Sequence, residues 1–355
     1  MKVLNGNKDR SKADVLLDEF FAGQRLSLRE CYIVLTGDHG VSGEFARCDP
    51  ARMREHFGAA FVEALDSTSW AVALGNAIER RVHAEIDDMP ELQAWRKIAR
   101  PVPVKSFRPQ HGTRIGGYPN LPAVAEQGAY AALDSPGDDN ASYSLSKRGG
   151  TESITLEMLA NDDAGAVRRV PAELARSAAM TLYEFVFDFL RTNPLIYDGV
   201  ALFDATHGNL GAAALDTSAY FAAATAIGKQ TRPGSGKRIG FGRKYLVVPL
   251  DLQEAAFTAF VSGQREVSQA SALLPEVLPV PYWTDANDWC VVNDPQYCPT
   301  IEIGFLNGRE APEIITADAP SDGSLFSHDK IIYKIRHAYG GTVLDYRGMY
   351  KNAVV

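Results

Sequence analysis

The sequence predicts an α+β fold, in which helices and mixed strands follow one another without a strict repeat. Two patterns carry this prediction. An unusually long amphipathic helix is expected over 171–192, and short apolar runs typical of strands alternate with helical patterns beyond it. The composition is that of a folded protein, since 46% of the 355 residues are hydrophobic and 23% are charged.

The overall charge and the cysteine content exclude several classes of protein. The formal net charge is −8, which argues against a surface dominated by contacts to DNA phosphates. No run approaches the roughly 18–20 apolar residues of a membrane helix, and the amino terminus has no apolar core of a secretion signal. The cysteines are too few and too scattered for a disulfide framework, so we expect buried thiols in a reducing compartment: Cys31, Cys48, Cys290 and Cys298.

The first 30 residues carry mixed charge around one dense apolar cluster, which comprises Val15, Leu16, Leu17, Phe20 and Phe21. A helix over 12–21 is expected, but a helix this short is marginal in water by itself. The segment is therefore predicted to be an arm that lies on another surface. A strand at 31–38 and helices at 50–65 and 68–83 are expected to follow.

A long excursion is predicted in the middle of the chain. A strand at 102–107 leads into 108–141, which is rich in Gly, Pro, Asn and Asp and has little periodicity. Alternating apolar residues on both sides of Lys147–Gly150 predict a two-stranded arm with a turn at those residues. A loop this long is uncommon inside a compact domain, so we expect it to project and to contact a partner.

The helix predicted over 171–192 begins at Pro171 and ends before Asn193-Pro194. One apolar stripe follows helical spacing along it: Leu174, Ala178, Leu182, Phe185 and Phe189. Val186, Phe187 and Leu190 widen this stripe, so we expect the last turns to be buried on more than one side. At about 1.5 Å per residue the helix is roughly 33 Å long.

An α/β pattern fills the rest of the chain. A helix is expected at 217–228 and a fully apolar strand at 245–250, after which Asp251 and Glu254 are typical of a helix start. The further expected strands are 277–282, 288–292 and 300–306, with two more within 330–350 on either side of Gly340-Gly341.

No motif for catalysis, cofactor binding or metal binding emerges. The seven histidines form no HExxH pattern, and Gly234-Ser235-Gly236-Lys237 lacks the first glycine of a phosphate-binding loop, since Thr231 stands there. His207, in DATHGNLG, is the best candidate for a catalytic residue, although a polar turn explains the same letters. We therefore predict no catalytic residue, no cofactor and no metal.

Charge is distributed unevenly in two segments. Residues 229–244 hold six Lys and Arg without an acid, and residues 310–322 hold four Asp and Glu without a base. Both are explained by solvated loops. The alternative is charge complementarity between copies of the chain, since opposite patches on one surface steer self-association.

Three segments resemble one known family. DGVALF at 198–203 followed by HGNL at 207–210 is similar to the Mu-like major head subunit of tailed bacteriophages. LSLRE at 26–30 running into TGD at 36–38, and KYLVVP at 244–249, resemble the same family. This resemblance implies the Hong Kong ninety-seven capsid fold. It has an amino-terminal arm, a projecting two-stranded E-loop, a peripheral domain with a long spine helix, and an axial domain around the symmetry axes.

The expected parts follow this order along the chain. They are the amino-terminal arm and first helix (1–66), the first part of the peripheral domain (67–104), the E-loop (105–150), the peripheral domain with the spine helix (151–195), the axial domain (196–325) and the peripheral carboxy-terminal strands (326–355). The candidate residues for contacts between subunits are Leu16, Leu17, Phe20, Phe21, Arg114, Tyr118, Lys147, Arg148, Lys237, Arg238, Glu310 and Glu313.

The function implied is that of a major capsid subunit. It would assemble as hexamers and pentamers, in the cytoplasm of the bacterial host, into an icosahedral virion shell around double-stranded DNA. Sequence-specific DNA binding and membrane contact are not expected, and portal, scaffold or decoration proteins of the same phage are possible partners. The alternatives are an encapsulin-like compartment, a tail or decoration protein, and an α/β hydrolase that uses His207.

Overall fold

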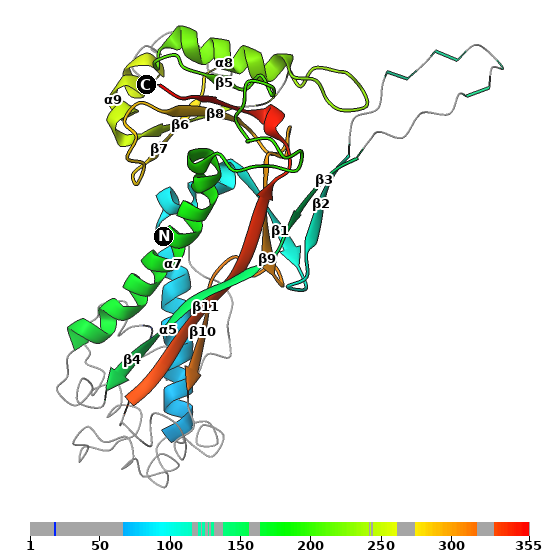
Figure 1. Ribbon diagram of the computed structural model, residues 1–355. Coiled ribbons are helices and arrows are strands. Elements are labelled where there is room, and N and C mark those ends of the chain that lie inside the picture. The colour runs from blue at the N-terminus through cyan, green and yellow to red at the C-terminus, as the bar shows by residue number, and fades with distance from the viewer. Residues whose placement is uncertain are drawn as a thin grey trace. The chain divides into compact units, whose positions relative to one another are not determined.

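The computed structural model describes Asp18 and residues 67–115, 120–121, 123–124, 127, 129–130, 138–155, 164–240, 242, 244–260, 274–317 and 330–354 (Figure 1). The elements expected within the first 66 residues lie outside this set, except that Asp18 is helical. The chain divides into two compact units. The first contains the chain up to Pro90, Lys147–Met180 and Ala311–His337, and the second contains Glu91–Ser146, Thr181–Glu310 and Ala338–Val355.

The first unit combines helical and strand segments. Its elements are α5 (Ser67–Asp87), most of β4 (Ser146–Thr155), β10 (Glu313–Ala317) and the first parts of α7 (Ala164–Thr192) and β11 (Lys330–Val343). Strand β10 pairs antiparallel with β11, with Ile314 opposite Ile335, and β4 pairs with β11 as well. Helix α5 packs on β10 and buries Ala77, Ile78 and Val82.

The predicted turn at Lys147–Gly150 is wrong, because these residues lie inside strand β4. A Cβ atom added to Gly149 would stand 2.1 Å from the carbonyl oxygen of Ile335 in β11. The glycine is needed there because two backbones approach closely, and not because the chain reverses. The two-stranded arm is formed instead by β2 (Gln110–Ile115) and β3 (Asp138–Tyr143), which pair antiparallel.

In the second unit, strand β1 (Ala99–Val104) runs parallel to β9 (Ile301–Leu306), and β9 pairs antiparallel with the end of β11. The helix η2 (Pro90–Lys97) buries Trp95, whose ring centroid lies 5.8 Å from that of Phe305. The expected break at Gly340-Gly341 is absent, since β11 runs continuously through both residues. A Cβ on Gly340 would lie 2.3 Å from the carbonyl oxygen of Ser144, so close packing explains this glycine too.

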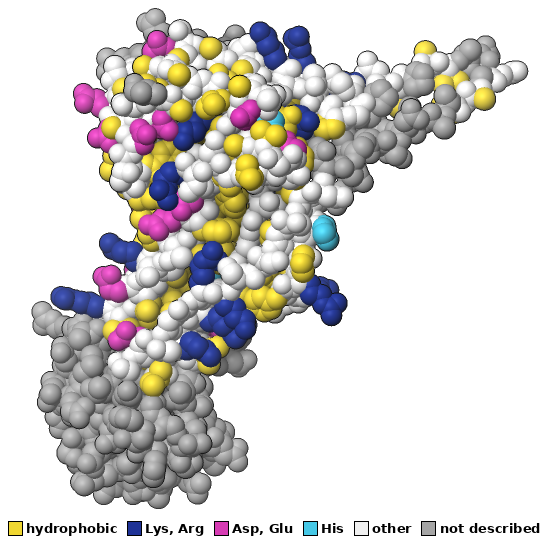
Figure 2. Space-filling model, viewed as in Figure 1, with side chains coloured by type: hydrophobic (Ala, Val, Ile, Leu, Met, Phe, Trp, Pro, Cys, Tyr) yellow, Lys and Arg dark blue, Asp and Glu magenta, His cyan; other side chains and the backbone are white. Residues whose placement is uncertain are grey.

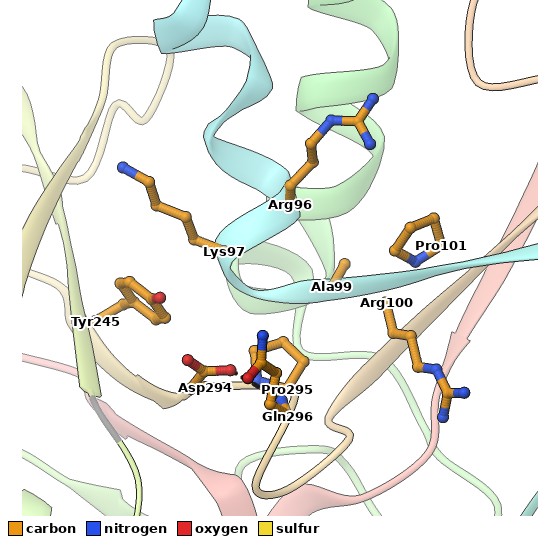
Figure 3. A pocket seen from close by; sticks show the side chains of 9 residues that line it. All are labelled: Arg96, Lys97, Ala99, Arg100, Pro101, Tyr245, Asp294, Pro295 and Gln296. Carbon is orange, nitrogen blue, oxygen red and sulfur yellow. Dashed lines mark hydrogen bonds between the residues drawn. The ribbon is translucent and has the colours of Figure 1, made fainter.

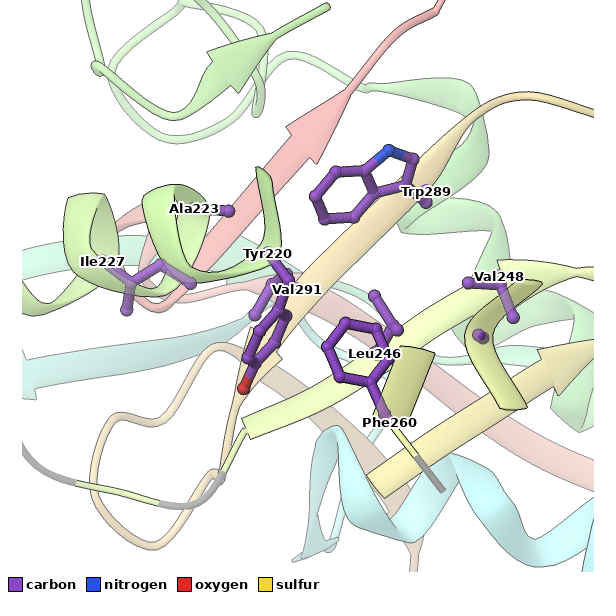
Figure 4. Close-up of a cluster of buried hydrophobic side chains, with 9 residues drawn as sticks. Tyr220, Ala223, Ile227, Leu246, Val248, Phe260, Trp289 and Val291 are labelled. Carbon is purple, nitrogen blue, oxygen red and sulfur yellow. The ribbon is translucent and has the colours of Figure 1, made fainter. Parts of the chain in front are cut away.

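A second sheet in this unit has the strand order β5-β12-β8-β6-β7. Its strands are β5 (Leu210–Gly211), β12 (Met349–Asn352), β8 (Trp289–Asn293), β6 (Lys244–Pro249) and β7 (Glu276–Val280). Helix α8 (Thr217–Lys229), η3 (Leu250–Leu252) and α9 (Gln253–Phe260) accompany the sheet. Figure 4 shows the core, where Tyr220 of α8 meets Phe260 of α9 at a centroid distance of 5.0 Å beside Leu246 and Trp289.

The helices and strands predicted within 217–306 are confirmed to within a few residues by α8, β6, β7, β8 and β9. The carboxy-terminal segment differs from its prediction. The whole of 326–355 was assigned to the peripheral domain, whereas β12 lies between β5 and β8, in the sheet built from 196–325. A partly buried ion pair between Lys351 Nζ and Asp288 Oδ2, 2.8 Å apart, helps to hold it there.

Helix α7 begins at Ala164, seven residues before the predicted start, and contains Pro171. The buried face is also shifted by one position, since Leu174, Ala178, Phe185 and Phe189 are only partly buried. The deeply buried side chains are Ala175, Ala179, Leu182, Tyr183, Val186, Phe187 and Leu190. In the last turns these buried residues form one face, and Phe185 and Phe189 beside it are partly buried.

Candidate subunit-contact surfaces

The base of the two-stranded arm is clamped to strand β9. The hydroxyl of Tyr143, at the end of β3, donates a hydrogen bond to Glu302 Oε1 at 3.0 Å. Burial, together with the nearby Glu302 carboxylate, raises the pKa of Tyr143 well above its usual range. A Cβ atom on Gly304 would lie 2.7 Å from this hydroxyl, so glycine is required for the ring to reach its position.

The far part of the arm exposes large apolar side chains. Leu121 is 79% exposed and Tyr130 is 88% exposed, whereas Tyr143 at the base is only 7% exposed. Of the candidate contact residues in this region, Arg114 lies in β2, and Tyr118 lies outside the described residues. Lys147 and Arg148 lie in β4, with Lys147 exposed and Arg148 half-buried.

The basic loop, residues 229–238, is the second candidate surface. Four cations in it are exposed: Lys229, Arg232, Lys237 and Arg238. The loop has a defined backbone, in which the Arg232 amide donates to the Lys237 carbonyl at 2.8 Å and Gly234 and Gly236 adopt positive φ angles of 74° and 64°. These angles favour glycine, which explains the Gly-Ser-Gly sequence without any phosphate-binding role.

Glu310 and Glu313 belong to the acidic segment for which charge complementarity between copies is the alternative to a solvated loop. In the structure each carboxylate pairs with an arginine of its own subunit. Glu310 pairs with Arg96 Nη1, and Glu313 Oε2 lies 2.6 Å from Arg336 Nη2. A contact between subunits would have to replace these pairs, so the acidic partner of the basic loop is better sought elsewhere.

His207, the best candidate for catalysis in the sequence, is a structural residue. Its ring is buried and stacks on Tyr346 with a centroid distance of 3.8 Å. Its Nδ1 lies 3.2 Å from the Leu202 carbonyl oxygen and its Nε2 lies 2.8 Å from Asp198 Oδ2. Both nitrogens face acceptor atoms of the protein, so neither is available to a substrate, and the hydrolase alternative loses its base.

A pocket of about 580 Å³ is lined by three cations: Arg96, Lys97 and Arg100 (Figure 3). The side chains of Arg96 and Arg100 point in opposite directions in this view. Arg96 and Lys97 are already paired with Glu310 and Glu276. Since the cations do not converge and two of the three are already paired, the pocket does not form an anion site.

A groove beside α9 was not identified from the sequence. It has a volume of about 470 Å³ and is lined by Leu250, Gln253, Glu254, Phe257, Val277 and Pro279. Asp251 lies next to this lining, and we call the whole surface the acidic groove. Figure 2 shows Asp and Glu side chains (magenta) over α9 with hydrophobic side chains (yellow) beside them. The sequence of 253–260 does not reveal this groove. Which apolar side chains of a helix stay exposed depends on what packs against its opposite face.

The described part of the chain shows no metal site, no membrane-spanning helix and no exposed thiol. No group of three or more His, Cys, Asp or Glu side chains there is arranged to hold a metal ion. None of the helices described is long and apolar enough to span a bilayer. Cys290 and Cys298 are buried free thiols, and burial raises the pKa of Cys290 to about 12. Cys31 and Cys48 lie outside the described residues.

Comparison with known proteins yields one family match and several similar structures. A family model described as phage capsid protein matches residues 139–352. The capsid of an empty GTA particle is 14% identical over 74% of this chain and 90% of its own, with a TM-score of 0.48. The structure from Mycobacterium phage Bobi is 12% identical over 75% of this chain and 89% of its own, with a TM-score of 0.48. The virus-like particle from Pyrococcus furiosus is 8% identical over 78% of this chain and 98% of its own, with a TM-score of 0.43. No curated protein matches the chain.

The family match extends from β3 to β12 and therefore includes α7, the whole sheet β5-β12-β8-β6-β7, and every strand of the other five-stranded sheet except β1. It also includes 198–210 and 244–249, two of the segments on which the resemblance to a phage head subunit rests. The match covers more than half of the residues. The chain belongs to the phage capsid protein family, and the predictions of a structural, non-enzymatic subunit of the virion shell are thereby confirmed.

Proposed function

We propose that this chain is a major capsid subunit of the Mu-like kind with the Hong Kong ninety-seven capsid fold. In this proposal it assembles as hexamers and pentamers into an icosahedral shell that encloses double-stranded DNA. The observation that carries the proposal is the arm formed by β2 and β3. Its base is fixed to β9, whereas Leu121 and Tyr130 beyond the strands are 79% and 88% exposed in the single chain.

Exposed apolar side chains at the end of a projecting arm need a partner. An isolated pair of strands is marginal in water, and its unpaired edges favour aggregation unless they are covered. In a shell built from one chain, identical neighbours supply the covering surface at every position. The arm is accordingly assigned the role of the E-loop, within 105–150.

The remaining domain assignments are part of the same proposal. Residues 1–66 would form the arm and first helix, 67–104 and 151–195 the peripheral domain with α7 as its spine, and 196–325 the axial domain. Strand β12 is added to the axial domain, because it lies inside that sheet, between β5 and β8. Portal, scaffold and decoration proteins remain candidate partners by analogy with other phages.

Assembly and hydrogen exchange test this proposal. The purified chain should form closed polyhedra in negative-stain micrographs, whereas rings or trimers alone would indicate a tail or decoration protein. Backbone amides beyond the paired strands, around Leu121 and Tyr130, should exchange quickly in free subunits and slowly in shells. Strong protection in both states would show that the arm packs on its own subunit, and would remove the observation on which the proposal rests. Shells that package co-expressed enzymes and exclude DNA would favour the encapsulin-like alternative.

A further inference from the structure

We propose that the basic loop of one subunit docks into the acidic groove of the next copy, and that this head-to-tail contact closes the capsomer ring. The inference rests on the proposed function, because it names the surfaces through which copies of this chain would meet. Both surfaces lie in the second unit, so the argument uses contacts within one compact part of the molecule.

The basic loop presents exposed positive charge, and we call it, together with the Tyr297 side chain, the knob. Lys237 and Arg238 are exposed, and neither has an ion pair within the described part of the chain. The guanidinium of Arg232 donates to the carbonyl of Tyr297 at 3.5 Å, which connects the loop to the turn after β8. The Tyr297 side chain is 51% exposed, so the knob presents an aromatic ring as well as positive charge.

The acidic groove has the complementary composition. Leu250 is 49% exposed and Phe257 is 55% exposed, so two large apolar side chains are exposed together in one groove. Asp251 and Glu254 are exposed, and within the described residues neither forms an ion pair. Strand β7 lies at the edge of the sheet and contributes Val277 and Pro279, so no further strand of the described chain covers this side.

The two surfaces lie at opposite ends of β6. The basic loop precedes Lys244, the first residue of β6, and Tyr297 follows β8, whose last residue pairs with Lys244. The acidic groove begins at Leu250, directly after the last residue of β6. Six residues of strand span about 20 Å. A knob and a receiving groove at opposite ends form a heterologous contact, which produces a ring when the rotation closes.

The partner of the basic loop is better explained as the acidic groove of a second copy than as DNA. Four cations on one loop would attract phosphates, but DNA binding would leave the exposed Leu250 and Phe257 without a role. Two acids of the segment 310–322, Glu310 and Glu313, already have arginine partners. Asp251 and Glu254 are exposed on the same unit, and charge complementarity at a contact selects its partner and orientation.

Charge exchange tests the proposed contact. The variant Lys237→Glu/Arg238→Glu makes the loop acidic, and Asp251→Lys/Glu254→Lys makes the groove basic. Each variant alone should raise the subunit concentration required for ring formation by roughly tenfold or more, since like charges then face each other. A chain that carries all four substitutions should form rings again. Glu173→Lys/Arg176→Glu, on exposed residues of α7, is the matched control and should assemble as the natural chain does.

A mixture of the two variants provides a sharper test. In an alternating ring every acidic loop meets a basic groove and every basic loop meets an acidic groove, provided that the number of subunits is even. An equal mixture should therefore restore hexamers but not pentamers, as measured by sedimentation velocity and native mass spectrometry. The four-substitution chain should restore both.

The outcomes distinguish this contact from DNA binding and from failure of the proposed function. If the acidic-loop variant forms normal rings and shells but binds a fluorescent DNA duplex more weakly, the loop contacts DNA and the inference is wrong. Normal assembly of both variants without any change in DNA binding also overturns it. If the natural chain forms no shell, the proposed function fails first. Circular dichroism of each variant identifies any that do not fold, and rescue by the four-substitution chain is then the deciding measurement.

Discussion

Two phenylalanines on α7 give a quantitative test of which helix face is buried. Phe187 is fully buried, and its ring centroid lies 4.4 Å from that of Tyr183. Phe185 is only partly buried, and its ring meets Phe189 and Tyr339 edge-on at centroid distances of 5.4 Å and 5.3 Å. The two substitutions to alanine remove the same atoms from neighbouring positions of one helix, so their difference reports burial.

The expected magnitudes follow from these surroundings. Truncation of a fully buried Phe costs about 3–5 kcal/mol of unfolding free energy, because the cavity is added to the lost transfer energy. Phe185→Ala loses two aromatic contacts worth about 0.5–1.5 kcal/mol each, so we expect about 1–3 kcal/mol. Phe187→Ala should therefore be less stable than Phe185→Ala by about 2 kcal/mol.

Urea unfolding of unassembled subunits measures both values. The midpoint of each transition, followed by tryptophan fluorescence, gives the change in unfolding free energy if the slope is unchanged. The sequence pattern alone places Phe185 on the buried stripe and Phe187 at its margin. Equal costs, or a larger cost for Phe185→Ala, would support that pattern and refute the burial seen in the structure.

Three further predictions concern close packing, the His207 ring and the buried thiols. Gly340→Ala should destabilise the chain because its Cβ would meet the Ser144 carbonyl, whereas Gly150→Ala, with no atom within 4 Å of its Cβ, should leave the melting temperature nearly unchanged. His207→Ala should lower the melting temperature without loss of any hydrolytic activity, and ester turnover abolished by this change would contradict the structural role. Cys290 should resist alkylation in the native subunit at pH 8, as peptide mapping by mass spectrometry would show, because its pKa is raised to about 12.

Much of the second unit was predictable from sequence alone. Local patterns sufficed for α8 and for strands such as β6, since an uninterrupted apolar run such as 245–250 has few alternative structures. The basic loop was also visible, because charge without nearby acids depends only on the order of residues. The resemblance to a phage head subunit came from short segments of the same region, and the family match includes two of them.

Features that depend on contacts between segments far apart in the chain could be determined only from the tertiary structure. Glycine pairs at 149–150 and 340–341 were read as turns, because glycine permits both a reversal and a close approach, and only the neighbouring strand shows which applies. The helix face buried in α7 and the partners of Glu310 and Glu313 likewise depend on residues more than 20 positions away. The acidic groove had no signal of its own in the sequence. A groove is the space left when helix and sheet have packed, and its residues become a surface only once the rest of the unit has folded around them.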